Sequence, residues 1–313
     1  MARLLKIKKK RYQTWEEGVE GFILFKSAQG ICDITIRDYR YHLAKFFNQF
    51  PQSWDDNDCL KQSVLIYFAQ SRHLAPVTHN MRRKYLKCFF SWVVKEGFLK
   101  SNPLDDIRLR HEEPRVRDLD NDKLKKLMGM FDKGSYSGLR DYAYLCLTLD
   151  TGIRPSEGLA LMTNNLNLKS LEVFIPSFIA KTRVSRTLPI SPTTVNAIRE
   201  LISVRSDSWS SDTPLFATAD GNPFVTNSWT KRLAKYSERL GFKISAYDLR
   251  HVFALMYLRN GGNALALQRT MGHTDLEMTK RYVNLTQNDL REAHCLVSPL
   301  GKIIQKRERL RKV

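Results

Sequence analysis

Apolar residues recur at helical spacing through the first third of the chain, from Thr14 to about Gly97. Thr14, followed by two acidic residues, is typical of a helix N-terminus. Two later segments carry apolar stripes on one face, and these stripes consist of Ile36, Tyr39, Leu43 and Phe47, and of Met81, Tyr85, Phe89, Trp92 and Val93. We therefore predict a helical first domain over residues 1–107.

The helical pattern stops at SNPLDDIRLRHEEPRVRDLDND, where two prolines and dense charges of both signs predict a linker over residues 108–118. The segment LEVFIPSFIAKTRVSRTLPIS is rich in β-branched residues and predicts a hairpin with a polar, basic turn. Helical patterns surround it, at 121–131, 138–151, 192–204, 226–240, 247–260, 263–271 and 275–283. We predict a mainly α fold whose second domain, 119–313, holds a small β-sheet and ends in a tail from about 286.

The net charge of +19, from 51 Lys and Arg against 32 Asp and Glu, narrows the function classes. We expect a protein with this net positive charge to bind a polyanion, and nucleic acid is the leading candidate. No stretch approaches the apolar length that spans a bilayer, and the N-terminus lacks a hydrophobic signal core, so we expect a cytoplasmic protein. Five scattered cysteines without a CxxC pair argue against disulfides and structural zinc.

Basic side chains flank both apolar stripes of the first domain, where they can reach a duplex. These candidate DNA-binding residues are Arg37, Arg40, Arg83, Lys84 and Lys87. For each of them the alternative interpretation is a solvated charged face.

Four short stretches of the second domain hold basic or proton-carrying groups, and they read DTGIRPSE, IAKTRVSR, SAYDLRH and MGHTDLEMTKRY. Their order and spacing resemble the tyrosine recombinases, the family of phage integrases, Xer proteins and Cre. The last stretch is the most specific, because Tyr282 follows His273 by nine positions. The resemblance covers nearly the whole chain. It implies a helical, SAM-like core-binding domain followed by an α+β catalytic domain.

The resemblance implies a transesterification at phosphorus. Tyr282 would attack the scissile phosphate to form a 3′-phosphotyrosyl bond, and a 5′-hydroxyl would leave. Arg154 and Arg250 would clamp the phosphate oxygens with their planar, permanently charged forks. Lys181 would protonate the leaving oxygen, and His273 would donate to a non-bridging oxygen. Since the phosphotyrosine conserves the bond energy, neither ATP nor metal is expected, and the sequence shows no P-loop and no carboxylate-rich metal site.

The choice of Lys181 rests on the resemblance as much as on chemistry, because Arg183 and Arg186 lie close to it in sequence. Arg183 is a further candidate for contact with DNA. Glu157 resembles the family's Arg-x-x-Glu pattern, and we interpret it as a structural partner of the arginines. His251 is expected to be a packing or capping residue.

One position departs from the family, which usually has His-x-x-Arg where this chain has Tyr247 three residues before Arg250. A phenol can donate a hydrogen bond to phosphate, but it does not easily accept the nucleophile's proton at neutral pH. The proton of Tyr282 would then go to water, to the substrate or to His273. The alternative for Tyr247 is a packing aromatic.

The leading interpretation is a site-specific DNA recombinase of simple Xer, plasmid or transposon-resolution type, without room for an arm-binding domain. Its expected partners are double-stranded DNA, an accessory protein, and other protomers in a tetramer. These protomers exchange C-terminal segments, and the candidate element is the residues after Leu285, including Leu290–Leu300. No membrane partner and no cofactor are expected. The alternatives are a type IB topoisomerase-like enzyme and a non-catalytic DNA-binding protein on the same fold.

Overall fold

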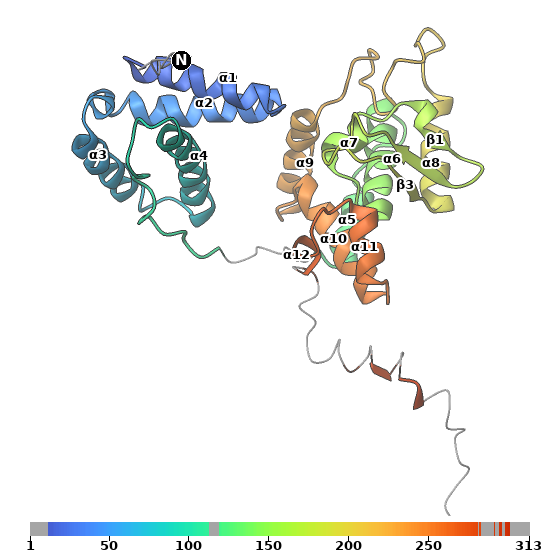
Figure 1. The fold of residues 1–313 in the computed structure, drawn as a ribbon. Helices are drawn as coiled ribbons and strands as arrows, with labels where there is room; N and C mark the ends of the chain where they lie inside the picture. Colours follow the sequence, from blue (N-terminus) through green and yellow to red (C-terminus); the bar gives the residue numbers. More distant parts are fainter. Residues whose placement is uncertain are drawn as a thin grey trace, which may run out of the picture. The chain divides into compact units, whose positions relative to one another are not determined.

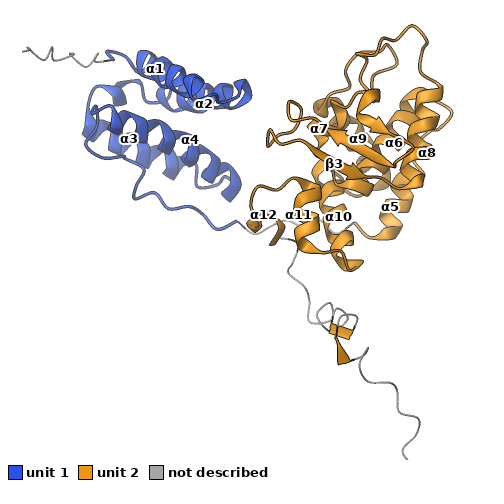
Figure 2. Ribbon diagram, turned by 45° about the vertical axis from the view of Figure 1, so that its right-hand side comes forward, with its two compact units in different colours: residues 1–113 blue, residues 114–313 orange. Residues whose placement is uncertain are grey.

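The computed structural model describes residues 12–112 and 119–280, together with Tyr282, Arg291, 294–295 and 298–300. The chain divides into two compact units, residues 1–113 and 114–313 (Figure 2). The predicted linker positions 113–118 and most of the predicted tail, including 290, 292–293 and 296–297 of the segment Leu290–Leu300, lie outside the described residues. The mainly helical fold class is confirmed, and each unit is described below by itself.

The described residues of unit 1 form four α-helices and one 3₁₀ turn, as predicted for a helical first domain. These are α1 (Trp15–Ala28), α2 (Asp33–Phe47), η1 (Pro51–Trp54), α3 (Asn57–Gln70) and α4 (Pro76–Lys95). The Thr14 side chain accepts a hydrogen bond from the backbone N–H of Glu17, so the predicted cap of α1 is confirmed. Helix α1 runs beside α2, which packs against α4 (Figure 1).

Aromatic rings fill the core between these helices. The ring of Phe89 on α4 meets the rings of Phe22 and Phe47 edge-on, at centroid distances of 5.4 and 5.8 Å. Edge-to-face contacts of this kind add to the stabilisation from burial alone. The predicted α4 stripe is wrong at one residue, because the side chain of Met81 is 42% exposed. Met81 instead lines an open groove along α4, between Val77 and Ser91, which has a volume of about 560 Å³.

The segment that follows unit 1's last helix is fastened to α4 by polar contacts. The amide of Asn80 donates to the carbonyl of Arg110 and accepts from its N–H, both at 2.9 Å. The guanidinium of Arg83 donates to the carbonyl of Ile107, and Lys87 pairs with Asp105 at 2.9 Å. The chain is therefore anchored to unit 1 at least as far as residue 110.

Replacing Asn80 by Ala should release this anchored segment. The change removes both hydrogen bonds to the backbone of Arg110, at a cost of about 1–2 kcal/mol in the free energy of unfolding. Amide hydrogen exchange at Arg110 should accelerate, whereas the exposed control Gln52→Ala should leave that rate unchanged. An unchanged exchange rate at Arg110 in Asn80→Ala would contradict the anchoring role.

Unit 2 combines eight helices of the described residues with a small sheet. The α-helices are α5 (Asn121–Met128), α6 (Tyr136–Thr151), α7 (Pro155–Leu159), α8 (Pro192–Ser203), α9 (Thr226–Leu240), α10 (Ala246–Arg259), α11 (Ala264–Met271) and α12 (Glu277–Lys280). The last of these is shorter than the predicted span 275–283. The side chain of Asn263 accepts from two N–H groups at the start of α11, and Gly272 ends it in a left-handed conformation.

The sheet has three antiparallel strands in the order β1 (Leu166–Asn167), β2 (Glu172–Ile175) and β3 (Arg186–Pro189), joined to α7 through the 3₁₀ turn η2 (Thr163–Asn165). Val173 pairs with Leu188, and both point into the core. The predicted hairpin, with Lys181 on the connection between β2 and β3, is confirmed. Helix α6 packs against α8 and against α10. Helix α10 contacts α11, which contacts α12, so α6 connects α8 with the group of helices α10, α11 and α12 (Figure 2).

Within the part of the chain that the structure describes, no helix has both the length and the apolar character that crossing a membrane requires.

Candidate active site

Arg154 is placed by a turn that requires glycine. Helix α6 ends at Gly152, whose φ of 60° is left-handed and whose missing Cβ would lie 2.2 Å from the ring of Phe253. The chain then turns directly into α7, with Arg154 as its N-cap residue. The Arg154 side chain is only 6% exposed, and it donates to Glu157 Oε1 at 3.2 Å and to the carbonyl of Gly272 at 2.7 Å.

Arg250 approaches the same place from α10. Its side chain is 5% exposed and donates to the carbonyls of Gly152 and of Met271, the latter at 2.7 Å. Burial, and then the positive charge of Arg154, lower the pKa of Arg250 to about 10, so it keeps its charge at neutral pH. Two desolvated guanidinium groups that repel each other form a preorganised site for an anion.

Glu157 lies beneath these arginines and joins three segments. Its carboxylate is fully buried and accepts from Arg154, from Arg186 Nη2 at 2.5 Å and from the backbone N–H of Lys181 at 2.9 Å. Burial by itself favours the neutral acid, yet the hydrogen bonds from Arg186 and Lys181 hold the pKa of Glu157 below its usual value. One buried charge therefore fixes α7, the hairpin loop and β3 together.

Replacing Glu157 by Gln should destabilise the protein by about 3–5 kcal/mol, because the change leaves the guanidinium groups of Arg154 and Arg186 buried without a counter-charge. Urea unfolding of the full chain measures the loss. The matched control is Glu172→Gln on the exposed side of β2, which should alter the free energy of unfolding by less than about 0.5 kcal/mol. Equal effects of the two changes would contradict the role given to Glu157.

Arg186 is a member of this cluster that the sequence did not single out. It donates to the carbonyl of Thr270 at 3.2 Å as well as to Glu157, and so connects β3 with α11. A signal was present in the sequence, since Arg186 is two residues from the buried Leu188 and strand side chains two apart share a face.

The backbone of Lys181 belongs to the cluster, while its side chain is exposed on the loop between β2 and β3. Arg183 on the same loop has a left-handed φ of 56°. A cavity of about 610 Å³ opens beside the loop, between residues 182–187 and residues 268–274 at the end of α11. The anion site thus borders an open cavity that can admit a ligand.

His273 and Tyr282 lie on the segment after α11, against α10. The Tyr282 side chain is 7% exposed and packs with Phe253, Leu267 and Met271. Its ring is nearly parallel to that of His273, with centroids 6.4 Å apart, and Nδ1 of His273 is hydrogen-bonded to Thr279 Oγ1 at 2.9 Å. Burial and the neighbouring guanidinium groups, Arg250 foremost, lower the pKa of His273 to about 4.

Stability should depend on pH through His273. An unfolded histidine titrates near pH ~6.5, so between about pH 4 and 6.5 the unfolded chain binds more protons at this position than the folded chain does. The free energy of unfolding should therefore rise with pH across this window and reach its full value above it. His273→Gln should flatten that rise in denaturation series, and His73→Gln, at an exposed position, should not. Parallel curves for the protein and His273→Gln would contradict the prediction.

His251 is the second residue that the sequence did not assign to the site. Its Nδ1 is hydrogen-bonded to the hydroxyl of Tyr282, with ring centroids 5.4 Å apart. The packing or capping role expected for it does not describe this contact with the phenol. The signal available in the sequence was its position next to Arg250, since the neighbouring residue on a helix points about 100° away and can face a different part of the same site.

Tyr247 stands at the start of α10 with its side chain 52% exposed, so it is not a packing aromatic.

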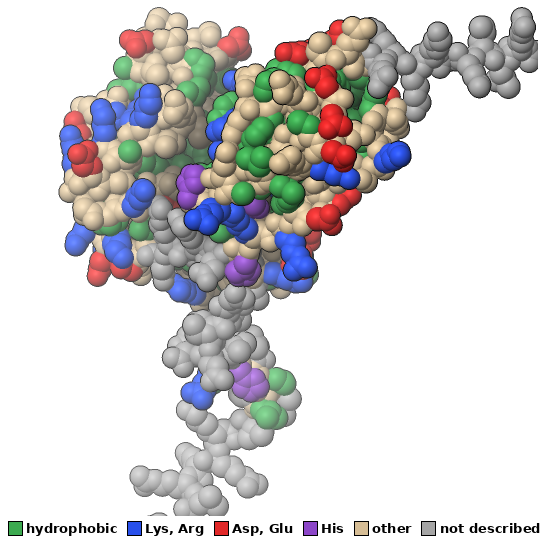
Figure 3. Space-filling model, turned by 90° about the vertical axis from the view of Figure 1, so that its left-hand side faces the viewer, with side chains coloured by type: hydrophobic (Ala, Val, Ile, Leu, Met, Phe, Trp, Pro, Cys, Tyr) green, Lys and Arg blue, Asp and Glu red, His purple; other side chains and the backbone are tan. Residues whose placement is uncertain are grey.

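The predicted DNA-binding residues of unit 1 lie at its surface. Arg40 pairs with Glu20, while Arg83, Lys84 and Lys87 line the groove on α4 with Met81. Arg37 is exposed on α2. Lys and Arg side chains spread over the face of the molecule seen in Figure 3, with Asp and Glu side chains among them.

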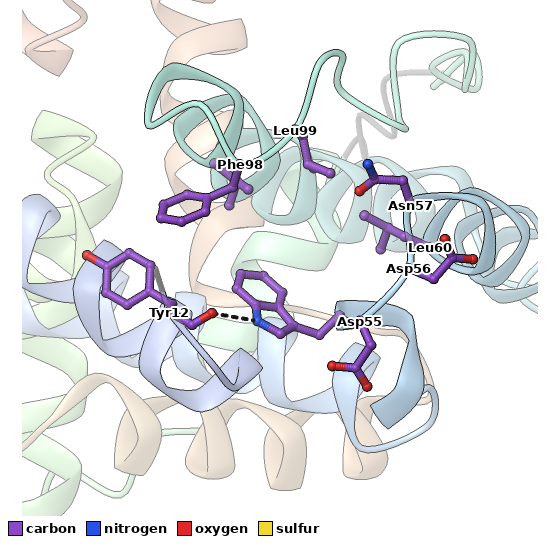
Figure 4. Close-up of a pocket in the computed structure, with 9 residues that line it drawn as sticks. Tyr12, Asp55, Asp56, Asn57, Leu60, Phe98 and Leu99 are labelled. Carbon is purple, nitrogen blue, oxygen red and sulfur yellow. Dashed lines mark hydrogen bonds between the residues drawn. The ribbon is translucent and has the colours of Figure 1, made fainter. Parts of the chain in front are cut away.

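A smaller cavity of about 210 Å³ in unit 1 has a different character (Figure 4). Tyr12, Trp54 and Phe98 contribute aromatic walls, and the indole N–H of Trp54 donates to the carbonyl of Tyr12 at 3.4 Å. Asp55 and Asp56 add acidic groups, which repel phosphate. This cavity therefore does not suit a nucleic-acid backbone.

Residues 117–289, which hold this arginine cluster and Tyr282, match the model of the phage integrase family. This match covers more than half of the chain, and the chain belongs to the phage integrase family. The resemblance to the tyrosine recombinases is thereby confirmed, and the enzyme class is that of the tyrosine site-specific recombinases.

The chain is similar over most of its length to named recombinases. It is 28% identical to the tyrosine recombinase XerC of Shigella flexneri serotype 5b over 91% of this chain and 97% of that protein. It is 27% identical to XerC of Shewanella amazonensis, over 82% of this chain and 86% of that one.

Two solved structures share the fold. The Tn1549 transposon integrase, in complex with a circular intermediate DNA, superposes with a TM-score of 0.73 at 17% identity, over 91% of this chain and all of that one. The XerH site-specific recombinase bound to difH has a TM-score of 0.66 at 19% identity, over 90% of this chain and 83% of that one.

Proposed function

We propose that the protein cleaves and rejoins DNA strands at specific sites through a covalent 3′-phosphotyrosyl intermediate on Tyr282. The observation that carries this proposal is the setting of the Tyr282 hydroxyl, which is hydrogen-bonded to His251, the residue next to Arg250, and which interacts electrostatically with Arg250.

The side chains take distinct roles in this reaction. Arg154 and Arg250 hold the non-bridging oxygens and stabilise the charge that grows in the transition state. His273, neutral at working pH, donates a hydrogen bond to the same group. Lys181, exposed on its loop at the edge of the cavity, reaches out to protonate the leaving 5′-oxygen. Tyr247 donates a hydrogen bond to the phosphate from the start of α10.

Double-stranded DNA is the proposed partner. The solved recombinases that share the fold are held in complexes with DNA. In unit 1 the groove on α4 supports the same partner, since Lys84 offers a cation for phosphates and Val77 and Met81 offer apolar contacts for bases. Arg83 and Lys87 also line this groove, and they would contact phosphates from the positions that the Ile107 carbonyl and Asp105 give them. We propose that Arg37, Arg40 and Arg183 add further phosphate contacts.

The finer biological assignment is also a proposal. A simple Xer-like recombinase is supported by the alignment with XerC, which runs over 97% of that protein. We propose that four protomers act on two DNA sites, exchange the segment Leu290–Leu300 between neighbours, and work with an accessory protein. Mixing two labelled duplexes separates this assignment from a topoisomerase-like one, because only a recombinase joins strands of one duplex to strands of the other.

The experiment that tests the proposed function uses duplexes recovered by repeated binding selection on the full chain, each nicked at successive positions. A nick near the cleavage point lets the short strand diffuse away, which traps the covalent intermediate. We expect an adduct that survives denaturation, and peptide mapping should place the DNA on the peptide that contains Tyr282. Absence of any adduct, or linkage to another residue, would overturn the proposal.

A further inference from the structure

The hydroxyl of Tyr282 has a specific neighbour on α10. Nδ1 of His251 is within hydrogen-bonding distance of this oxygen, and the two rings are tilted by 45°. His251 follows directly after Arg250, whose side chain is bound to the carbonyls of Gly152 and Met271. Tyr282 also belongs to the apolar cluster that includes Phe253 and Leu267.

The other titratable groups of the site are poorly placed to take the phenolic proton. Nδ1 of His273 is engaged by Thr279, and the His273 ring lies nearly parallel to the Tyr282 ring with the centroids 6.4 Å apart. The Glu157 carboxylate already accepts from Arg154, Arg186 and Lys181. Tyr247 is itself a phenol, and it is half exposed.

We propose that His251 is the general base for Tyr282, an inference that rests on the proposed phosphotyrosyl chemistry. As the phenolic oxygen bonds to phosphorus, its proton passes to Nδ1 of neutral His251, which becomes imidazolium. The bond from phosphorus to the 5′-oxygen breaks, and that oxygen takes a proton from Lys181. In rejoining, the 5′-hydroxyl attacks, Tyr282 leaves with the proton of His251, and Lys181 regains its own. No further reactant is consumed.

The surrounding charges are consistent with this transfer. Among the described residues, Arg250 interacts electrostatically with Tyr282, and His273 interacts with His251. The charges that act on Arg250 and His273 in turn are those of Arg154, Arg186 and Glu157. The positive groups favour a phenolate and disfavour an imidazolium while the site is empty. A bound phosphate cancels part of this positive charge, so His251 accepts the proton most readily when the substrate is in place.

The first test uses the full chain and the nicked duplex that traps the covalent intermediate, called the trapping duplex below. It measures the single-turnover rate of cleavage from pH 5 to pH 9. His251→Asn is the decisive variant, because the Asn oxygen can accept the hydrogen bond near the position of Nδ1 but cannot take the proton. We expect cleavage to slow by about 100- to 10,000-fold, the usual contribution of general acid–base catalysis. We expect the cleavage rate of the unmodified protein to reach a plateau as the pH rises. In His251→Asn this plateau should be absent, so that the cleavage rate rises with hydroxide concentration over the whole pH range. His73→Asn, at an exposed position of unit 1, is the matched control.

A substrate with sulfur in place of the leaving 5′-oxygen separates base from acid, because a thiolate leaves without a proton. Cleavage of this duplex should be restored in Lys181→Ala and should stay slow in His251→Asn. A wild-type pH profile in His251→Asn, or its restoration by the sulfur substrate, would overturn the assignment. Failure of the proposed function looks different, since the unmodified protein would then form no adduct or Tyr282→Phe would still form one, and either result overturns both proposals.

A second measurement needs no DNA and no cleavage. Nitrogen-15 spectra of histidine-labelled full chain report which ring nitrogen carries the proton in neutral His251, with His251→Asn used to assign the signal. We expect the proton on Nε2, so that Nδ1 accepts from the phenol, and we expect this signal to shift in Tyr282→Phe. A neutral form protonated on Nδ1 would make His251 a donor to the phenol and would overturn the proposal.

Discussion

Tyr282→Phe should abolish covalent attachment to DNA and leave the fold intact. The change removes the hydroxyl that contacts His251 and keeps the ring that packs with Phe253 and Met271. Because no other group replaces the nucleophile, cleavage of the trapping duplex should fall below detection. Binding of the same duplex should stay within a few-fold of the unmodified protein, since the guanidinium groups are unchanged.

The matched control is Tyr257→Phe. Tyr257 packs on the edge of the same apolar cluster as Tyr282, and its ring lies 5.6 Å from that of Phe253. Losing this hydroxyl should leave the yield of adduct unchanged. An adduct in Tyr282→Phe would assign the nucleophile to another residue, and loss of the adduct in both variants would point to general damage to the cluster.

Arg250→Lys should lower the cleavage rate by about 100- to 1,000-fold, the usual cost of removing one donor to a developing oxyanion. Lysine keeps the charge, but its ammonium is a single point that cannot bind the carbonyls of Gly152 and Met271 and still present two N–H groups to a phosphate. The rate is measured at saturating enzyme with the trapping duplex.

The control for this change is Arg259→Lys, on the exposed end of the same helix, which should leave the rate within about two-fold. Unfolding curves of both variants show whether the folded population is preserved. A rate for Arg250→Lys within ten-fold of the unmodified protein would mean that charge alone suffices, and it would contradict the need for a planar fork.

Local patterns predicted the helices well, because their signals lie within each segment. Thr14, Gly152 and Gly272 mark helix ends through capping and left-handed turns, which depend on a few neighbouring residues. Met81 was misplaced because helical spacing tells which residues share a face, and does not tell where along the helix the core ends. The length of the helix α12 was overestimated for a similar reason. The helical pattern of the sequence covers 275–283, whereas α12 spans Glu277–Lys280.

The candidate site was predictable as a set of residues and not as a set of contacts. Arg154, Arg250, His273 and Tyr282 stand in recognisable motifs, and each lies within unit 2's cluster. The partners that hold the two arginines are mostly backbone carbonyls, which no residue type reveals. His251 and Arg186 were missed because their roles depend on tertiary neighbours more than thirty or eighty positions away.

The carbonyls of Gly272 and Met271 have a thermodynamic consequence. They begin the segment that leads to Tyr282, and they accept hydrogen bonds from Arg154 and Arg250, the same groups proposed to hold the phosphate. A ligand that draws on these N–H groups therefore changes the free energy of the segment, and the position of the segment changes the affinity for the ligand by an equal amount. Phosphate binding and the position of the segment that carries Tyr282 are thus two readouts of one coupling energy.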